Sequence, residues 1–145
     1  MTALTTDRST PRRERGTKQG GVAATVQIFQ GALVMRNAAG YLTKGQMATG
    51  LVGVGRAEQN VLGGASAGDV SLTVREGVYP FANSASTDQI TIAQIGKLCY
   101  AVDDQTVAKT DNSGARSPAG IVEDIDPNGQ VWVRLDEALT NALVS

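Results

Sequence analysis

Carboxylates are the main side chains in this 145-residue chain whose spacing suggests chemistry. They gather at Asp103 and Asp104, and again at Glu123, Asp124 and Asp126. A glycosidase would need two such groups held across a sugar-sized cleft, one of them with a raised pKa. Adjacent acids in polar turns more often accept hydrogen bonds from their own backbone. We therefore expect these residues to shape turns, and we expect no catalytic residues and no enzyme activity.

Other catalytic or metal-binding groups are scarce. The chain has no histidine, so the commonest general base and the commonest metal ligand are both missing. Cys99 is the single cysteine, and its neighbours Leu98 and Tyr100 predict a buried, apolar side chain. One cysteine forms no intrachain disulfide, and a zinc site of the Cys/His type is excluded. The segment 124–129 lacks the distal acid of an EF-hand, so we expect no metal and no cofactor.

The stretch 50–55 (GLVGVG) is similar to a phosphate-binding loop. Its glycines do not have the GxGxxG spacing of a dinucleotide site, and no GxxxxGK[ST] motif occurs in the chain. Within the longer segment 47–57, the same glycines predict a strand with bends, bulges or close contacts between backbones. We therefore expect no nucleotide ligand.

The elements that position these residues are predicted to be short strands. Seventeen glycines and frequent Ser, Thr, Asn and Asp favour turns over long helices. In residues 69–81, Val70, Leu72 and Val74 alternate with polar residues, which indicates a strand with one buried face. Pro80 is expected at the end of this strand or on an edge.

A hairpin and a short helix are predicted in the second half of the chain. The turn 126–129 (DPNG) joins two apolar runs, 119–125 and 130–135, as a hairpin does. A helix is expected between Thr87, as its cap, and Gly96, as its end. The periodicity of residues 136–144 fits either a short helix or an extended segment. The predicted fold is mainly β, a small β-sandwich or barrel-like (β-tulip-like) domain with one short α-helix.

Residues 1–20 are predicted to form an extended N-terminal arm, separate from a β-rich domain over 21–145. The arm has five basic and two acidic residues, a net +3, whereas the remainder has eight basic and twelve acidic residues, a net −4. A segment this polar buries too little apolar surface to order by itself. We expect it to become ordered when it lies on a partner surface.

The basic side chains of the arm are candidates for contact with that partner: Arg8, Arg12, Arg13, Arg15 and Lys18. Nucleic acid is disfavoured because Glu14 interrupts the run, the chain is slightly acidic, and no aromatic residue is interspersed. Arginine also pairs bidentately with protein carboxylates, so a protein partner is the better hypothesis.

Trp132 is a second candidate for binding. Tryptophan is enriched among interface hot spots, although packing against a neighbouring strand explains the residue equally well. No apolar run approaches the roughly 20 residues that span a bilayer, and the N-terminus lacks the apolar region of a signal peptide, so we expect neither a membrane partner nor export.

Two segments of the sequence resemble a known family. Residues 95–110 (IGKLCYAVDDQTVAKT) and 117–135 (SPAGIVEDIDPNGQVWVRL) are similar to the small head proteins of tailed bacteriophages. These are the capsid decoration proteins, also described as cement or minor capsid proteins, especially of Mu-like phages. The resemblance covers roughly residues 22–137, and its most specific parts are 102–107 and 119–122.

The resemblance implies a β-rich homotrimer on the outer surface of the capsid. Proteins similar to this one clamp neighbouring copies of the major capsid protein together, and their N-terminal arms often run along the shell. The implied partners are the major capsid protein and further copies of the chain. The implied location is the virion surface, after synthesis in the cytoplasm of the host bacterium. This chain departs from the simplest members by its longer, arginine-containing arm, which leaves the contacts of the arm open.

Two other classes of function stay open at this point. One is another structural part of the virion, a head–tail joining or tail-tube component, which would form rings of six or twelve copies. The other is a free binding module or an enzyme, which would be monomeric with a ligand-sized pocket lined by Asp103, Asp104 and Asp124.

Overall fold

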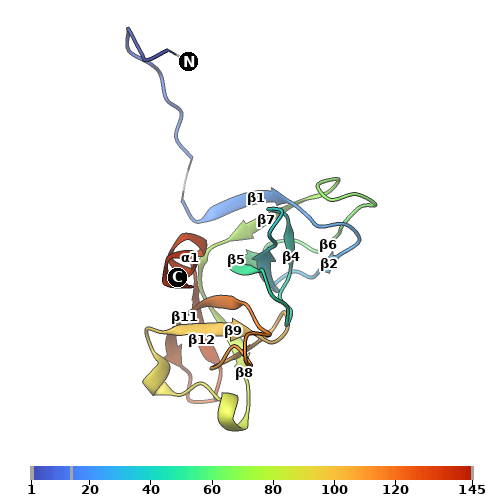
Figure 1. Cartoon of the computed structure of the whole chain (residues 1–145), viewed down its shortest axis with the longest axis vertical. Helices are drawn as coiled ribbons and strands as arrows, with labels where there is room; N and C mark the ends of the chain where they lie inside the picture. The colour runs from blue at the N-terminus through green and yellow to red at the C-terminus, as the bar shows by residue number, and fades with distance from the viewer. Residues whose placement is uncertain (1, 14, 145) are drawn as a thin grey trace.

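The computed structural model describes residues 2–13 and 15–144. Strands predominate and one α-helix closes the chain, which confirms the prediction of a mainly β, barrel-like domain with one short helix. The body has two stacked parts, a curled sheet and a closed barrel, and residues 2–13 extend away from it (Figure 1).

The curled sheet holds most of the first half of the chain. Its five antiparallel strands lie in the order β1-β7-β5-β3-β4, with the bounds β1 Thr17–Gly21, β3 Leu33–Arg36, β4 Leu42–Lys44, β5 Val52–Ala57 and β7 Ser71–Arg75. Val22, directly after β1, forms a parallel bridge with Leu42 of β4, so the two edges of the sheet approach each other. A short pair, β2 (Gln27–Ile28) and β6 (Val61–Leu62), adds Ile28 to the apolar core inside the curl.

The second half of the chain closes into a five-stranded barrel. Its order is β10-β8-β12-β11-β9, and its bounds are β8 Gly77–Asn83, β9 Leu98–Ala101, β10 Thr106–Ala108, β11 Pro118–Ile125 and β12 Val131–Leu135. Closure depends on β10, which pairs in parallel with β8 and antiparallel with β9. A closed barrel has no unpaired edge strand that could recruit another chain.

Strand β3 ties the two parts together because it is buried on both faces. Leu33 and Met35 belong to the core of the barrel, whereas Ala32 and Val34 belong to the core of the curled sheet. A strand covered on both sides is expected to be apolar throughout rather than alternating. This explains the run Ala32–Met35, which sequence alone identifies only as apolar.

The glycines of β5 allow the curled sheet and the barrel to pack backbone against backbone. A Cβ atom on Gly53 would lie 1.7 Å from the carbonyl oxygen of Ala119 in β11, and one on Gly55 would lie 2.6 Å from the carbonyl oxygen of Arg75. No side chain fits at such distances. The expectation of close backbone contact in GLVGVG is confirmed, although the strand covers only residues 52–57 of the predicted 47–57.

Several predicted turns and strands are confirmed. In DPNG, the N–H of Gly129 donates to the carbonyl oxygen of Asp126 at 2.8 Å, and Gly129 has a φ of +91°. The predicted alternation is seen in β7, where Leu72 and Val74 are fully buried. Because Gly77 has a φ of +147°, the predicted strand 69–81 is divided into β7 and β8.

Pro80 lies in the middle of β8 and not at a strand end, so of the two predicted positions it takes the edge, where one side of the strand is unpaired. It is paired with Trp132 of β12 on one side. On the other side, β10 pairs only with residues from Ala82 onward, so no ladder hydrogen bond is required from the position of Pro80.

The predicted helix between Thr87 and Gly96 is wrong. Two 3-10 helices, Ser86–Asp88 and Ile92–Gln94, take its place, although Gly96 has the expected positive φ of +87°. The side chain of Asn83 bonds both the N–H and the carbonyl of Ile90, at 2.9 Å each, and holds that residue buried between the two turns. These bonds take the backbone groups that a continuous helix would use.

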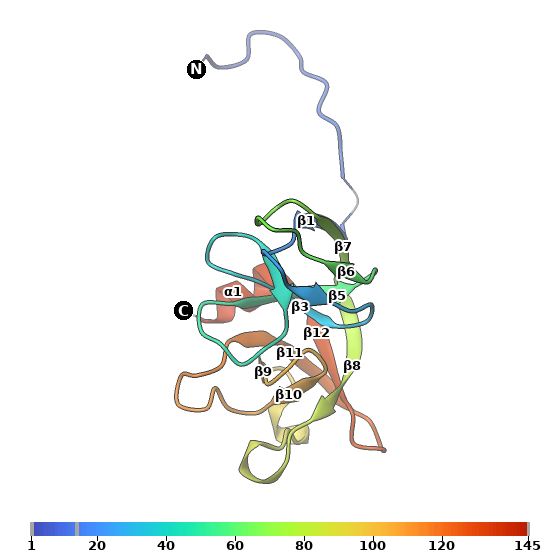
Figure 2. The same cartoon turned by 90° about the vertical axis from the view of Figure 1, so that its right-hand side faces the viewer.

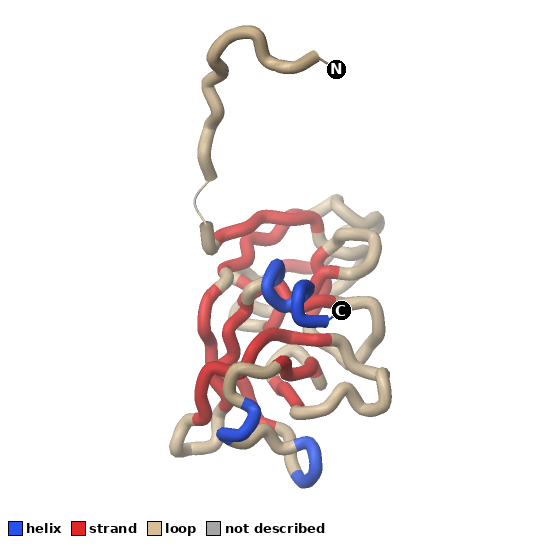
Figure 3. The backbone as a smooth tube through the Cα atoms, turned by 60° about the vertical axis from the view of Figure 1, so that its left-hand side comes forward, coloured by secondary structure: helices blue, strands red, loops and turns tan. Residues whose placement is uncertain are grey.

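The sequence allows either a helix or an extended segment over residues 136–144, and the structure shows a helix, α1 (Glu137–Val144). Figure 3 shows α1 lying across the outside of the strands, and its contacts are with β5 of the curled sheet and β11 of the barrel. The helix begins where the Asp136 carboxylate accepts a hydrogen bond from the N–H of Leu139 at 3.1 Å, as an N-cap does.

Candidate interaction surface

The N-terminal arm separates into a projecting part and an anchored root. Residues 2–13 extend from the body in both views, and Arg8, Arg12 and Arg13 are exposed (Figures 1 and 2). The anchored part begins earlier than the expected boundary at residue 20. The carbonyl oxygen of Gly16 accepts from the N–H of Glu76 at 2.6 Å, and β1 pairs with β7 from Thr17 onward.

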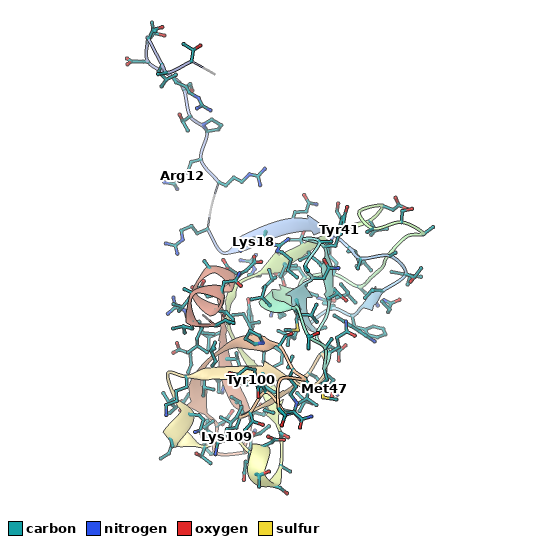
Figure 4. The ribbon with its side chains drawn as sticks, in the orientation of Figure 1. Arg12, Lys18, Tyr41, Met47, Tyr100 and Lys109 are labelled. Atoms are coloured by element: carbon teal, nitrogen blue, oxygen red, sulfur yellow. The ribbon has the colours of Figure 1, made fainter. Side chains whose placement is uncertain are left out.

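Lys18 belongs to the anchored root of the arm and not to the projecting residues 2–13 (Figure 4). Its Nζ lies 2.8 Å from Oε1 of Glu137 and 3.7 Å from Oε2 of Glu76. Arg36 reaches the same Glu137 carboxylate, with Nε 2.6 Å from Oε2. Burial disfavours the charge on Glu137, but the hydrogen bonds from Arg36 and Lys18 outweigh it and hold its pKa below the ordinary carboxyl value.

This cluster fastens the first strand to the last helix. Glu76 accepts a hydrogen bond from the N–H of Glu137 at 3.1 Å, so it satisfies a donor in the first turn of α1. The N–H of Leu139, with help from Arg134, holds the pKa of Asp136 below its usual value. Lys18 is thus committed to contacts within the chain, and the basic groups placed outside the body are Arg8, Arg12, Arg13 and Arg15.

Trp132 lies on an outward sheet face that is unusually apolar. On β8 this face presents Val78, Pro80 and Ala82, all exposed, and on β12 it presents the half-buried Trp132 and the exposed Arg134. The pairs are Trp132 with Pro80 and Arg134 with Val78. The solvated face of an antiparallel sheet is ordinarily polar. We call these five residues the β8–β12 face.

The indole of Trp132 combines an apolar surface with one polar contact. Its Nε1 donates to Oδ2 of Asp126 at 3.4 Å, which orients the ring over the strand pair. Trp132 can therefore both pack against a neighbouring strand and act as an interface anchor. An exposed apolar patch rimmed by charges is typical of a protein–protein interface.

A hollow joins the β8–β12 face to the root of the arm. It has a volume of about 420 Å³, and its lining includes Arg15, Gly16, Val78, Arg134 and Asp136. A second hollow of about 850 Å³ lies beside it over the Lys18–Glu137 cluster and is lined by Arg13, Arg15, Lys18 and Arg36 among others. The arm root, both hollows and the sheet face are thus neighbouring parts of one surface.

The structure places Asp103 and Asp104 in a turn and Asp126 at the start of the DPNG turn. Glu123 and Asp124 lie in β11, so the expectation that they shape a turn is wrong for these two. Asp103 accepts a hydrogen bond from the N–H of Gln105 at 2.9 Å, the turn-shaping contact expected from sequence. Asp104 lines a hollow of about 380 Å³ with Phe29 and Gln105, and Asp124 is not part of that lining. Among residues 2–13 and 15–144, no three His, Cys, Asp or Glu side chains converge as metal ligands do.

Cys99 is buried in the barrel, as predicted. Burial raises the pKa of its thiol to about 12, and Sγ lies 3.6 Å from the carbonyl oxygen of Gly120. The thiolate required for nucleophilic chemistry is therefore not formed at neutral pH.

Sequence reasoning identified Trp132 and missed the rest of the β8–β12 face. The signal was present in residues 77–83 (GVYPFAN), where both alternating sets of side chains are apolar. A strand that is apolar on both faces is normally buried on both faces. Here Phe81 faces the core, whereas Val78, Pro80 and Ala82 have no cover within the described residues.

No protein-family model, curated protein or solved structure gives a significant match to the chain. In the described part of the chain, no helix has the length and apolarity needed to cross a bilayer.

Proposed function

We propose that this protein is a structural virion component: a homotrimeric decoration protein on the outer surface of a tailed-phage head. In this role it is not an enzyme. It binds the major capsid protein and stabilises contacts between neighbouring capsid subunits, after synthesis in the cytoplasm of the host bacterium. The observation that carries the proposal is the apolar β8–β12 face beside the root of a basic, projecting arm.

Two weak contacts on one rigid body suit binding to a lattice. The β8–β12 face supplies apolar area and an aromatic anchor, and the projecting residues 2–13 supply three exposed arginines, Arg8, Arg12 and Arg13. When the face is docked, the arm searches only the volume its length allows, so its effective local concentration is high. The two contacts together then hold far more tightly than either one alone.

Binding of the purified protein to undecorated, expanded heads tests the proposal. Deletion of residues 2–13 and the substitution Val78→Glu are each expected to weaken binding by about tenfold or more, because each removes one of two linked contacts. Leu62→Glu is the matched control, since Leu62 is also an exposed strand residue but belongs to β6. Unchanged occupancy with both the deletion and Val78→Glu would exclude this mode of binding.

The deletion is expected to leave the fold intact. The N-terminal segment is tied to the body by the bond to Gly16 and by the β1–β7 pairing, both of which lie beyond the deleted residues. Thermal unfolding therefore provides the control for folding. A head–tail joining or tail-tube role predicts instead that the protein assembles in rings of six or twelve copies, which mass photometry distinguishes from a trimer.

A further inference from the structure

A groove crosses the outside of β9, away from the β8–β12 face. It has a volume of about 470 Å³ and is lined by Gln94, Gly96, Lys97, Leu98, Tyr100, Lys109, Thr110 and Leu143. Leu98 and Tyr100 alternate with the buried Cys99 and Ala101, so they lie on the outer surface of the barrel. Tyr100 and Lys109 are labelled in Figure 4. We call this feature the β9 groove.

The β9 groove has an apolar floor that is open to solvent. Leu143 of α1, which is 48% exposed, lines one side of it. Ile95, between the lining residues Gln94 and Gly96, is 43% exposed, and nearby Ile92 is 76% exposed. Exposed aliphatic side chains in the groove and in the segment that forms one of its walls indicate a surface that another molecule covers.

Two lysines give the groove positive charge. Lys97 and Lys109 are exposed, and neither has a carboxylate within ion-pair distance among the described residues. Burial, and after it the charge of nearby Asp111, raise the pKa of Tyr100, so Asp111 partly offsets the charge at the Lys109 end. The Lys97 end has no such compensation on the described part of the chain.

The complementary surface is the hairpin between β11 and β12. Glu123, Asp124 and Asp126 surround the half-buried Ile125, and none of the three carboxylates has an ion-pair partner within the described residues. Figure 2 shows this hairpin projecting from the barrel, well apart from the C-terminal end of α1. We call residues 123–129 the acidic hairpin.

We propose that the β9 groove of one copy receives the acidic hairpin of a second copy. Ile125 and the turn of the hairpin cover Leu98, Tyr100 and Leu143, while the carboxylates meet Lys97 and Lys109. A trimer requires each copy to use its groove toward one neighbour and its hairpin toward the other, so the contact is head-to-tail and joins copies into a closed ring if the rotation between them closes. This deepens the proposed function, on which it rests for the trimer, by naming the surfaces that join the copies.

Charge reversal on each surface tests this pairing in solution. The groove variant carries Lys97→Glu and Lys109→Glu, and the hairpin variant carries Glu123→Lys and Asp124→Lys, all at exposed positions. Each variant alone is expected to lose self-association, with a rise of about tenfold or more in the dissociation constant. Sedimentation velocity across a concentration series measures this, and circular dichroism verifies folding.

Mixing the two variants tests whether the groove and the hairpin pair with each other. The native groove of the hairpin variant attracts the native hairpin of the groove variant, and the two reversed surfaces also attract each other. An equimolar mixture is therefore expected to regain self-association, with the two variants alternating. All four substitutions in one chain are expected to restore the oligomer of the native protein. A native protein that is monomeric at 100 µM, or folded variants that associate as the native protein does, would overturn the proposal, as would a mixture that stays monomeric.

No phage heads are present in this experiment, so its outcome is independent of the proposed function. Self-association without binding to heads would refute decoration and leave the groove–hairpin contact standing. Binding of monomers to heads would refute the groove–hairpin contact and leave binding to the capsid standing.

Discussion

Glu137 is the residue on which the ends of the folded body converge. It holds Lys18 of β1 and Arg36 of β3, and its side chain is only 13% exposed. Removal of the Glu137 charge from this partly buried cluster leaves Arg36 without its carboxylate partner, while Lys18 keeps Glu76 at 3.7 Å. The effect should therefore exceed that of a surface ion pair, which is typically worth less than about 1 kcal/mol.

Glu137→Gln is expected to lower the free energy of unfolding by about 1–3 kcal/mol at pH 7. Because the pKa of Glu137 is lower in the folded protein than its reference value of 4.5, this stabilisation is present above pH 4.5 and is lost as the pH falls through the folded pKa. Urea unfolding of both proteins from pH 7 to about pH 2 measures the difference, which should vanish at the acid end. Glu123→Gln, at an exposed carboxylate without an ion pair, is the control, and an equal effect of the two substitutions would contradict the assignment.

Local chemistry at the residue scale was predictable, and distant pairing was not. The burial of Cys99 and the turn-shaping role of Asp103 follow from their immediate neighbours. Lys18 and Glu137 are 119 positions apart, so nothing in the sequence around Lys18 distinguishes an anchor from an arm residue. The structure shows that Lys18 makes ion pairs within the chain, and a contact of Lys18 with the capsid stays a prediction.

At the scale of elements, the junction of β5 with β11 decides whether the two parts of the body fit. Gly53→Ala would place a methyl group 1.7 Å from the backbone oxygen of Ala119, which no side-chain rotation relieves. We expect a loss of about 1–3 kcal/mol of unfolding free energy, or failure to fold, since the backbones must separate.

Gly20→Ala is the matched control for this prediction. Its Cβ would lie 3.0 Å from a terminal methyl carbon of Leu42, a side chain that can adjust. The melting temperature should fall much less than for Gly53→Ala. Equal stability of the two variants would mean that β5 and β11 are not packed as closely as described.

Elements with strong local signals were predicted well: the alternation in β7 and the DPNG turn depend on adjacent residues alone. The helix expected after Thr87 was wrong because the Asn83 side chain, seven residues from Ile90, competes for the backbone of Ile90. The division between β7 and β8 at Gly77 was missed for a related reason. A positive φ at one glycine interrupts a strand without changing the apolar pattern on either side of it.

At the scale of the whole molecule, four surfaces take two distinct roles in our account. The β8–β12 face and the arm contact the shell, and the β9 groove with the acidic hairpin joins the copies. The mainly β class of the fold could be predicted from composition and turn residues. The stacking of a curled sheet on a barrel could not, because it depends on β3 being buried on both faces and on β1 approaching β4 through Val22 and Leu42.

The most direct test of the central claim is a cryo-electron microscopy reconstruction of expanded heads incubated with the purified protein. The account predicts three copies around each three-fold or quasi-three-fold position, with the β8–β12 face and residues 2–13 against the major capsid protein. Density at those positions in which Val78 and Trp132 point to solvent, or heads that carry no copies at saturating protein, would contradict it.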